Sequence, residues 1–367
     1  MKFTHSRETL LEALQATLSA IEKKQTAPIL ENVLIQVRDG AIHWRGTNLE
    51  LEVAISTPII DATLGEVTLP ARKLFDICKS LPPESMIEFN IEDNRAKISC
   101  GRSRFELIAL PASEFPDLED IQINHEFMIP ENIFKQLFDS VSFAMANQDV
   151  RYYLNGLLLE LIPTHVRSVA TDGHRLSLYT YQMPTHVSDK IQIIVPRKSI
   201  LELTKLLRSD NQTNIKIQLS NNHLRVQLDH LRFTTKLVDG RYPDYQAAVP
   251  PQGKIRVEID RKELKEVLAR VAILSNEKFR GVRLELDNNK LRVQSNNPEQ
   301  ESAQDEIDVL YQGEEFSIGF NVNYLLDAVN HLDSDSMYMN FNSPESSALI
   351  TDPHNDNIRN VVMPIRL

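Results

Sequence analysis

The residues that could do chemistry lie closest together in the stretch ATDGHRL, residues 170–176. Asp172 and His174 could form an acid–base or metal-binding pair, because histidine titrates near neutral pH and carboxylates orient it. Together with His223, they suggest a hydrolase or metal enzyme whose turnover depends on a metal or on pH. No H-E-x-x-H, G-x-S-x-G or paired C-x-x-C motif supplies the nucleophile or the further ligand that such a site needs.

A structural interpretation explains the same stretch. Apolar strand residues flank it on both sides, so Asp172-Gly173 is typical of the tight turn of a β-hairpin, in which glycine takes a positive φ. A hairpin alone does not explain why polar and basic residues lie beside an apolar strand. A surface pocket for a partner would explain it.

The elements that would position this stretch form a pattern that occurs three times. In each copy, a helix is followed by a pair of strands, a second helix and a further set of strands. The first helices are expected at residues 6–22, with Ser6 as the N-cap, and at 130–146 and 260–275. The strand pairs are expected at 32–55, 156–181 and 281–300, and the second helices at 70–82, 195–207 and 320–332.

Matching loops close the first two copies, ASEFPDLED at 112–120 and DGRYPDYQA at 239–247. These loops set the domain boundaries that we predict, which are 1–121, 122–248 and 249–367. The length of 367 residues also exceeds what one hydrophobic core usually organises. The expected fold class is α+β, with three similar domains in which two helices cover one face of an antiparallel sheet.

The composition is that of an ordinary globular protein, with 42% hydrophobic and 25% charged residues. The sequence shows neither a signal peptide nor an apolar run of about 18 residues, which predicts a cytoplasmic protein without membrane contact. Cys78 and Cys100 are the only cysteines, and we expect both to be reduced.

The net charge of −11 argues against binding nucleic acid by bulk electrostatics. Positive charge is nevertheless concentrated on the second helices of the first two domains, which are basic on one face and apolar on the other. Their charged residues are Arg72, Lys73, Lys79, Arg197, Lys198, Lys205 and Arg208, against Asp76 and Glu202. This face is either a solvated helix surface or a surface that contacts phosphates without reading sequence. Arg151-Tyr152-Tyr153 adds a cation and aromatic rings that could stack on bases.

Specific motifs extend over the whole chain: PIL (28–30), PARKLFDIC (70–78), GRSRFEL (101–107), QDVRYYLNG (148–156), ATDGHRL (170–176), VDGRYPDY (238–245), ILSNEKFRGVRL (273–284), NNPEQE (296–301), GFNVNYLLD (319–327) and VVMPIRL (361–367). They resemble the motifs of the bacterial DNA polymerase III beta subunits, the sliding clamps. The resemblance implies a DNA clamp fold and a head-to-tail homodimeric ring of six domains, with helices lining a central hole. It also implies a processivity factor that encircles duplex DNA, without catalysis, cofactor or metal.

The resemblance assigns residues to three surfaces. The residues facing DNA would be Lys24, Arg72, Gln148, Tyr152, Tyr153, Arg197, Lys198 and Lys205. The dimer interface would contain Lys73, Arg102, Arg104, Phe105, Leu107, Ile273, Leu274, Glu299, Glu301 and Asp305, in which the arginines offer charge complementary to the acidic residues. The pocket for partner peptides would be formed by Leu154, Thr171, Gly173, His174, Arg175, Leu176, Pro243, Asn321, Tyr324, Val362, Met363, Pro364, Ile365, Arg366 and Leu367.

The implied partners are double-stranded DNA bound without sequence preference, a second copy of the chain, and the clamp loader complex. The DNA polymerase III alpha subunit, other polymerases and repair proteins would dock short peptides with apolar anchors in the pocket. The alternative is a three-domain peptide-binding scaffold that does not encircle DNA. The chain departs from the family at Gln246-Ala247-Ala248 and at Glu345, which bears on peptide preference and not on the pocket itself.

Overall fold

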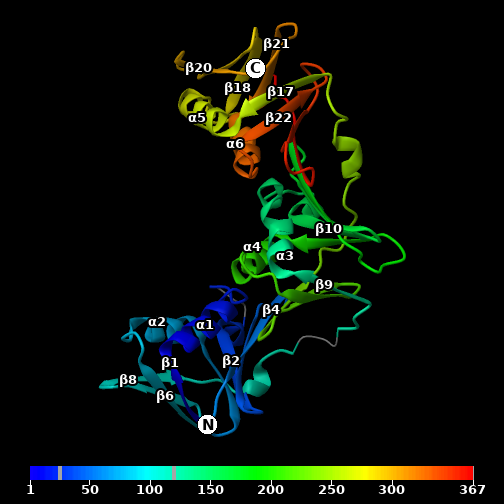
Figure 1. Cartoon of the computed structure of the whole chain (residues 1–367). Coiled ribbons are helices and arrows are strands. Elements are labelled where there is room, and N and C mark those ends of the chain that lie inside the picture. Colours follow the sequence, from blue (N-terminus) through cyan, green and yellow to red (C-terminus); the bar gives the residue numbers. More distant parts are fainter. Residues whose placement is uncertain (24–26, 118–120, 367) are drawn as a thin grey trace. The chain divides into compact units, whose positions relative to one another are not determined.

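The structure is a computed structural model that describes residues 1–23, 27–117 and 121–366. Within these ranges it contains six α-helices and 24 β-strands, so the chain is an α+β protein (Figure 1). Lys24 and Leu367, both predicted site residues, lie outside the described residues.

The predicted order of helix, strands, helix and strands occurs three times, and each repeat begins with an additional strand. The first repeat contains β1 (Lys2–Ser6), α1 (Arg7–Leu18), β2 (Asn32–Arg38), β3 (Ala41–Thr47), β4 (Leu51–Pro58), β5 (Gly65–Pro70), α2 (Ala71–Ser80), β6 (Met86–Glu92), β7 (Arg95–Cys100) and β8 (Ser103–Ile108). The second contains β9 (His125–Pro130), α3 (Glu131–Asp139), β10 (Gly156–Ile162), β11 (His165–Thr171), β12 (Arg175–Gln182), β13 (Ile191–Pro196), α4 (Arg197–Leu206), β14 (Asn214–Leu219), β15 (His223–Gln227) and β16 (Leu231–Lys236). The third contains β17 (Ile255–Asp260), α5 (Arg261–Val271), β18 (Gly281–Asp287), β19 (Lys290–Asn296), β20 (Ser302–Asp308), β21 (Phe316–Asn321), α6 (Val322–Asn330), β22 (Ser336–Phe341), β23 (Ala348–Thr351) and β24 (Ile358–Val362).

The structure corrects the number of strands between the helices. The stretches 32–55 and 156–181, predicted as strand pairs, each contain three strands. In the first repeat the second turn has neither glycine nor proline. The Asn48 side chain closes it by accepting hydrogen bonds from the backbone N–H groups of Glu50 and Leu51, at 3.1 and 2.8 Å.

The helix predicted at 130–146 is also shorter than expected. It ends at Asp139, and residues 142–144 form a separate 3₁₀ turn. The carbonyl groups of Ser140 and Phe143 instead accept hydrogen bonds from Ser177 and Arg175 on β12, at 3.1 and 2.7 Å. These side chains satisfy backbone groups that a longer helix would have paired internally.

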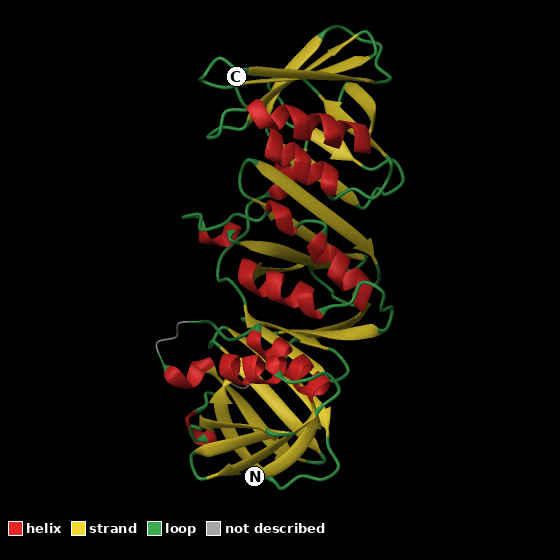
Figure 2. Ribbon diagram, turned by 90° about the vertical axis from the view of Figure 1, so that its left-hand side faces the viewer, coloured by secondary structure: helices red, strands yellow, loops and turns green. Residues whose placement is uncertain are grey.

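The helix pair of the first repeat packs closely on its sheet. Ser6 caps α1, as predicted, by accepting a hydrogen bond from the backbone N–H of Thr9 at 3.3 Å. A Cβ atom at Gly46 on β3 would lie 2.6 Å from the carbonyl oxygen of Thr17, so only glycine allows this approach of helix and strand. Figure 2 shows α1 and α2 side by side against the strands, in agreement with the predicted layering.

Two of the four sheets continue across the boundaries between repeats, which the sequence did not reveal. One has the order β5-β2-β3-β4-β16-β15-β14-β9, and the other β13-β10-β11-β12-β24-β23-β22-β17. Strand β4 of the first repeat therefore pairs with β16 of the second, and β12 of the second pairs with β24 of the third. The remaining sheets, β1-β6-β7-β8 and β20-β19-β18-β21, have four strands each.

Because of this pairing, the compact units of the chain cut across the repeats. One unit contains residues 1–132 and 201–237, and the other contains residues 133–200 and 238–367. The first unit holds the whole first repeat together with strands β9, β14, β15 and β16 of the second. The other unit holds the stretch at 170–176 together with the third repeat.

Both cysteines are free, as expected. Cys78 is buried on the inner face of α2, and burial raises the pKa of its thiol to about 12, so the thiol stays protonated. None of the described helices is long and apolar enough to cross a membrane.

Candidate functional site

The stretch at 170–176 forms the tight hairpin turn between β11 and β12 that the sequence predicts. Gly173 has a φ of 89°, and a Cβ atom there would lie 2.9 Å from the guanidinium of Arg151. The Asp172 carboxylate accepts hydrogen bonds from the backbone N–H groups of His174 and Arg175, at 2.9 and 3.0 Å. It also pairs with the Arg175 side chain at 3.1 Å. Asp172 therefore stabilises the turn.

A cavity of about 470 Å³ opens beside this hairpin. The hairpin, the 3₁₀ turn Tyr152–Leu154, the segment 243–250 and β24 form its walls. Residues predicted for the partner pocket that line it are Leu154, Thr171, Gly173, Arg175, Leu176, Pro243 and Met363. The cavity also has lining residues that the prediction omitted from the pocket, namely Arg151, Tyr153, Asp244, Tyr245, Ala247, Ala248, Pro250, Ser347 and Val361.

The segment 242–250 is held over the sheet by two tyrosines. The hydroxyl of Tyr242 accepts a hydrogen bond from the backbone N–H of Thr171 at 3.1 Å, and burial raises the pKa of this hydroxyl. The hydroxyl of Tyr245 donates to buried Glu160 at 2.7 Å and accepts from Arg167 at 2.9 Å. Both tyrosine rings belong to the hydrophobic core beneath the cavity. The two aromatic residues of the RYPDY motif were therefore the feature of the sequence that could have indicated this wall.

The remaining residues predicted for the pocket lie next to the cavity or away from it. His174 stacks on Tyr324 of α6 with 6.3 Å between the ring centroids, and Asn321 caps α6. Val362 is buried in β24. Pro364 and Ile365 are partly buried, Arg366 is exposed, and the backbone N–H of Ile365 donates to the carbonyl group of Gly319 at 2.8 Å.

Arg175 ties the hairpin to α6 and to the segment after α3. It pairs with Asp327 of α6, and it stacks on the ring of Tyr324 with its central carbon 4.5 Å from the centroid. It also lies 5.5 Å from the ring centroid of Phe143, whose carbonyl group it binds. These contacts hold the Arg175 side chain in place as part of the cavity wall.

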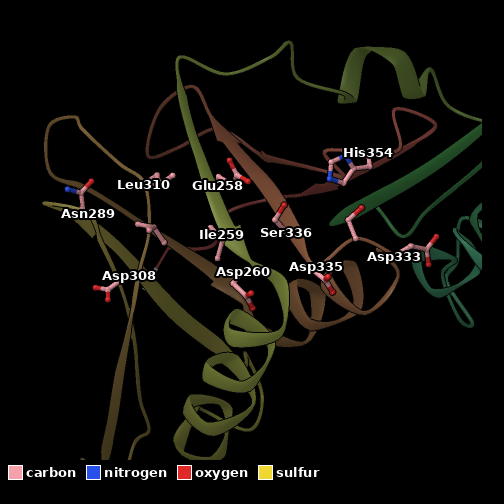
Figure 3. A pocket seen from close by; sticks show the side chains of 12 residues that line it. Glu258, Ile259, Asp260, Asn289, Asp308, Leu310, Asp333, Asp335, Ser336 and His354 are labelled. Carbon is pink, nitrogen blue, oxygen red and sulfur yellow. The ribbon is translucent and has the colours of Figure 1, made fainter.

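A larger cavity, of about 740 Å³, lies in the third repeat and contains no predicted site residue (Figure 3). Its charged lining is mainly acidic: Glu258, Asp260, Asp308, Asp333 and Asp335, with His354. The carboxylates are dispersed, with Asp308 and Asp333 at opposite sides of the view. Across the described ranges, no group of three His, Cys, Asp or Glu residues is placed to hold a metal ion.

Comparison with known proteins decides the family. The chain matches the DNA polymerase III beta subunit family in its N-terminal domain over residues 1–119, its central domain over 128–244 and its C-terminal domain over 246–366. The beta sliding clamps of Pseudomonas aeruginosa and Escherichia coli K12 are 45% and 43% identical to it, with full coverage of both chains. The chain belongs to the DNA polymerase III beta subunit family.

Solved beta subunits share its fold over the whole chain. The sliding clamp of Pseudomonas aeruginosa bound to griselimycin is 45% identical, covers both chains completely and has a TM-score of 0.97. The Caulobacter crescentus pol III beta is 33% identical, with complete coverage and a TM-score of 0.93. Members of this family are clamps and not enzymes, so the hydrolase hypothesis for Asp172, His174 and His223 is abandoned.

The described residues among those predicted to face DNA lie on α2 and α4 and on the loop after α3. Arg72, Gln148, Tyr152, Lys198 and Lys205 are exposed, whereas Tyr153 and Arg197 are partly buried. Several of these cations already have partners in the chain. Arg72 donates to the carbonyl group of Ile21 at 3.5 Å, Arg197 donates to that of Met145 at 2.9 Å, and Lys205 pairs with Glu202 at 2.9 Å. Tyr153 contributes to the cavity wall, a role that its position in the sequence did not indicate.

The residues predicted for the dimer interface lie on or next to β8 and β20, which each pair on one side, and on two other elements. Lys73 is on α2, and Ile273 and Leu274 belong to the 3₁₀ turn after α5. Phe105, Leu107 and Leu274 are partly buried, and Ile273 is 76% exposed. Lys73, Arg102, Arg104, Glu299 and Glu301 are exposed. Asp305 pairs with Arg270 at 2.7 Å within the chain, and this contact lowers the pKa of the Asp305 carboxyl.

Proposed function

We propose that the chain is a DNA sliding clamp, a processivity factor that encircles duplex DNA and tethers the replicative polymerase. The observation that carries the proposal is full-length membership of the beta subunit family, with all three domains in the family's order. The domains would be 1–121, 122–248 and 249–367, and the protein would act in the cytoplasm, where its thiols stay reduced.

The sheet topology supports a closed ring. At both junctions inside the chain, the fourth strand of one repeat pairs with the last strand of the next: β4 with β16, and β12 with β24. The strands left without this neighbour are β20 and β8. Pairing β20 of one subunit with β8 of the other, twice around a two-fold axis, would complete the same junction and close the ring.

The repeats also predict the register of this pairing. The repeats can be aligned strand by strand. In this alignment Arg104 on β8 corresponds to Arg232 on β16 and Arg359 on β24. Gln304 on β20 corresponds to Ala54 on β4 and Leu178 on β12. Because Arg232 pairs with Ala54 and Arg359 with Leu178, Arg104 should lie opposite Gln304 of the partner subunit. Phe105 then lies opposite Ala303 of the partner subunit. Arg102 then comes opposite Glu306 of the partner subunit, whereas the sequence pattern alone set the arginines against Glu299, Glu301 and Asp305.

The basic faces of α2 and α4 would line the hole of such a ring. Lys24, Arg72, Gln148, Tyr152, Tyr153, Arg197, Lys198 and Lys205 would contact phosphates or water around the duplex. Several of these cations, among them Arg72, Arg197 and Lys205, already have partners in the chain. Weak contacts suit a protein that is held by encirclement and must slide.

The cavity beside the hairpin would receive the peptides of the clamp loader, the DNA polymerase III alpha subunit, and other polymerases or repair proteins. It has an apolar floor of Leu154, Leu176 and Val361 and a polar rim that includes Arg175. This arrangement suits an extended peptide with apolar anchors. Griselimycin is bound to the related clamp of Pseudomonas aeruginosa, and we propose it as a probe for this site.

Processive DNA synthesis tests the proposal. A beta-dependent polymerase with its clamp loader and ATP should extend a primed single-stranded circle for far longer per binding event when the protein is added. If the products stay short while the protein still binds the polymerase, the peptide-binding scaffold that does not encircle DNA is the better account.

A further inference from the structure

Another cavity, of about 540 Å³ and distinct from the acidic one in the third repeat, lies on the same face of the sheet as the peptide pocket, and we call it the second cavity. The two cavities share Tyr245 and Pro250 of the segment that crosses the sheet, so they are neighbours on either side of it. The second cavity is much more polar: Arg167, Thr180, Gln182, Asn357 and Arg359 line it. A peptide in the first cavity would need only to extend past the segment to reach it.

A comparison of the repeats shows that, within the described residues, Arg359 lacks the carboxylate partner that the equivalent arginine has. In the sheet that contains β4 and β16, Arg232 lies opposite Ala54, and its guanidinium pairs with buried Glu52 at 3.4 Å. In the sheet that contains β12 and β24, Arg359 has the position of Arg232, and Leu176 has the position of Glu52. Leu176 lines the peptide pocket and offers Arg359 no carboxylate.

Of the two arginines that line the cavity, Arg359 is the one available to pair with a carboxylate of a ligand. Arg167 is held by Glu160 at 3.6 Å, and Lys190 also approaches Glu160 at 3.7 Å. Arg359 is exposed, and no acidic side chain of the described chain pairs with it. Asp356 also lines the cavity, and it is the nearby acidic group that would compete for Arg359 in solution.

We propose that this polar cavity receives an acidic side chain of the partner peptide, outside the apolar anchors, and that Arg359 sets the preference for it. The carboxylate would pair with Arg359 as Glu52 pairs with Arg232 in the first junction, but it would approach from the cavity and not from the position of Leu176. This inference rests on the proposed function, because it requires a peptide in the neighbouring pocket. It makes Arg359 a specificity-determining residue of the clamp.

Fluorescence anisotropy tests the proposal with labelled nonapeptides on a polar background that carry leucine and phenylalanine anchors. A single Glu, or its neutral isostere Gln, occupies each position outside the anchors in turn. At one or two adjacent positions the Glu peptide should bind the native protein about threefold to fivefold more tightly than the Gln peptide, as expected for a partly exposed ion pair. The difference should shrink between about 0.05 and about 0.5 M NaCl.

Variants assign the effect to one side chain. In Arg359→Gln the Glu and Gln peptides should bind equally, while the Gln peptide binds as it does to the native protein. Asp356→Asn, which removes the competing carboxylate, should increase the preference for Glu. Arg283→Gln is the matched control, because Arg283 is an exposed arginine of β18 outside both cavities, and it should retain the native ratio.

The outcomes separate this proposal from the proposed function. An unchanged preference for Glu in Arg359→Gln, or equal binding of both peptides at every position of the native protein, overturns the role of Arg359 and leaves the peptide pocket intact. If no peptide of the series binds the native protein, the peptide-docking part of the proposed function fails, and this inference fails with it.

Discussion

Replacing both Ile273 and Leu274 by alanine should break the ring into monomers. Ile273 is 76% exposed in the single chain, so most of its side chain is available for burial against a partner, and Leu274 is partly buried beside it. Truncation of a fully buried isoleucine or leucine to alanine costs about 2–5 kcal/mol. For side chains that are only partly buried by the partner, about 1.5 kcal/mol each is appropriate. Because the ring contains the interface twice, the loss is about 6 kcal/mol, and the dissociation constant rises about 10⁴-fold.

Sedimentation velocity at low micromolar protein concentration measures this change. The native protein should sediment as a dimer and the double variant as a monomer. The far-UV circular dichroism of the variant should match that of the native protein, which would show that the monomer is still folded. The matched control is Ile60→Ala with Leu64→Ala, since these side chains are 98% and 72% exposed in the first repeat and belong to neither β8 nor β20. A double variant that remains a dimer would refute the assignment of the interface to these residues.

Four further outcomes are expected. Gly173→Ala should lower the free energy of unfolding in urea by about 1–2 kcal/mol or more, because its φ of 89° and the nearby Arg151 guanidinium disfavour a Cβ atom; an unchanged value would show that the hairpin relaxes freely. Ala247→Trp should fill the partner pocket and weaken griselimycin binding at least about tenfold while the protein stays a dimer, as followed by calorimetry and sedimentation. Lys198→Glu with Lys205→Glu should reduce processive synthesis without changing peptide affinity, whereas equal losses of both would indicate misfolding. Burial lowers the pKa of His5 from its ordinary value of 6.5, so the unfolded chain takes up the proton more readily. The free energy of unfolding should therefore decline as the pH falls below about 6.5, and His5→Gln should flatten part of that decline.

The sequence predicted the repeated elements because helix periodicity and capping are local. Ser6 and the apolar side of α1 predicted the start of the first helix correctly, although the helix ends at Leu18 and not at residue 22, and Asp172-Gly173 predicted the hairpin. The length of α3 could not be read in the same way, because the carbonyl groups of Ser140 and Phe143 are bound by side chains of a strand more than 30 residues away. A local pattern contains no information about such competition.

The pairing of strands across repeats was missed for a related reason. Strand β4 pairs with β16 across about 180 residues of sequence, and hydrophobic alternation marks both as strands without naming the neighbour. The wall of the pocket also depends on contacts between residues that are distant in the sequence. Family motifs predicted Leu154, Thr171 and Leu176, but Tyr245 became visible as a wall residue only once the segment 242–250 was seen to cross the sheet.

Topological retention on DNA tests the central claim most directly. The protein is loaded onto nicked circular DNA by a clamp loader with ATP, the complex is washed at high salt, and the circle is then linearised. A protein that encircles DNA should survive the wash on circles and leave after linearisation, because only the linkage holds it. Retention on linear DNA, or loss from the circles in the wash while the loader's ATPase responds to the protein, would contradict encirclement.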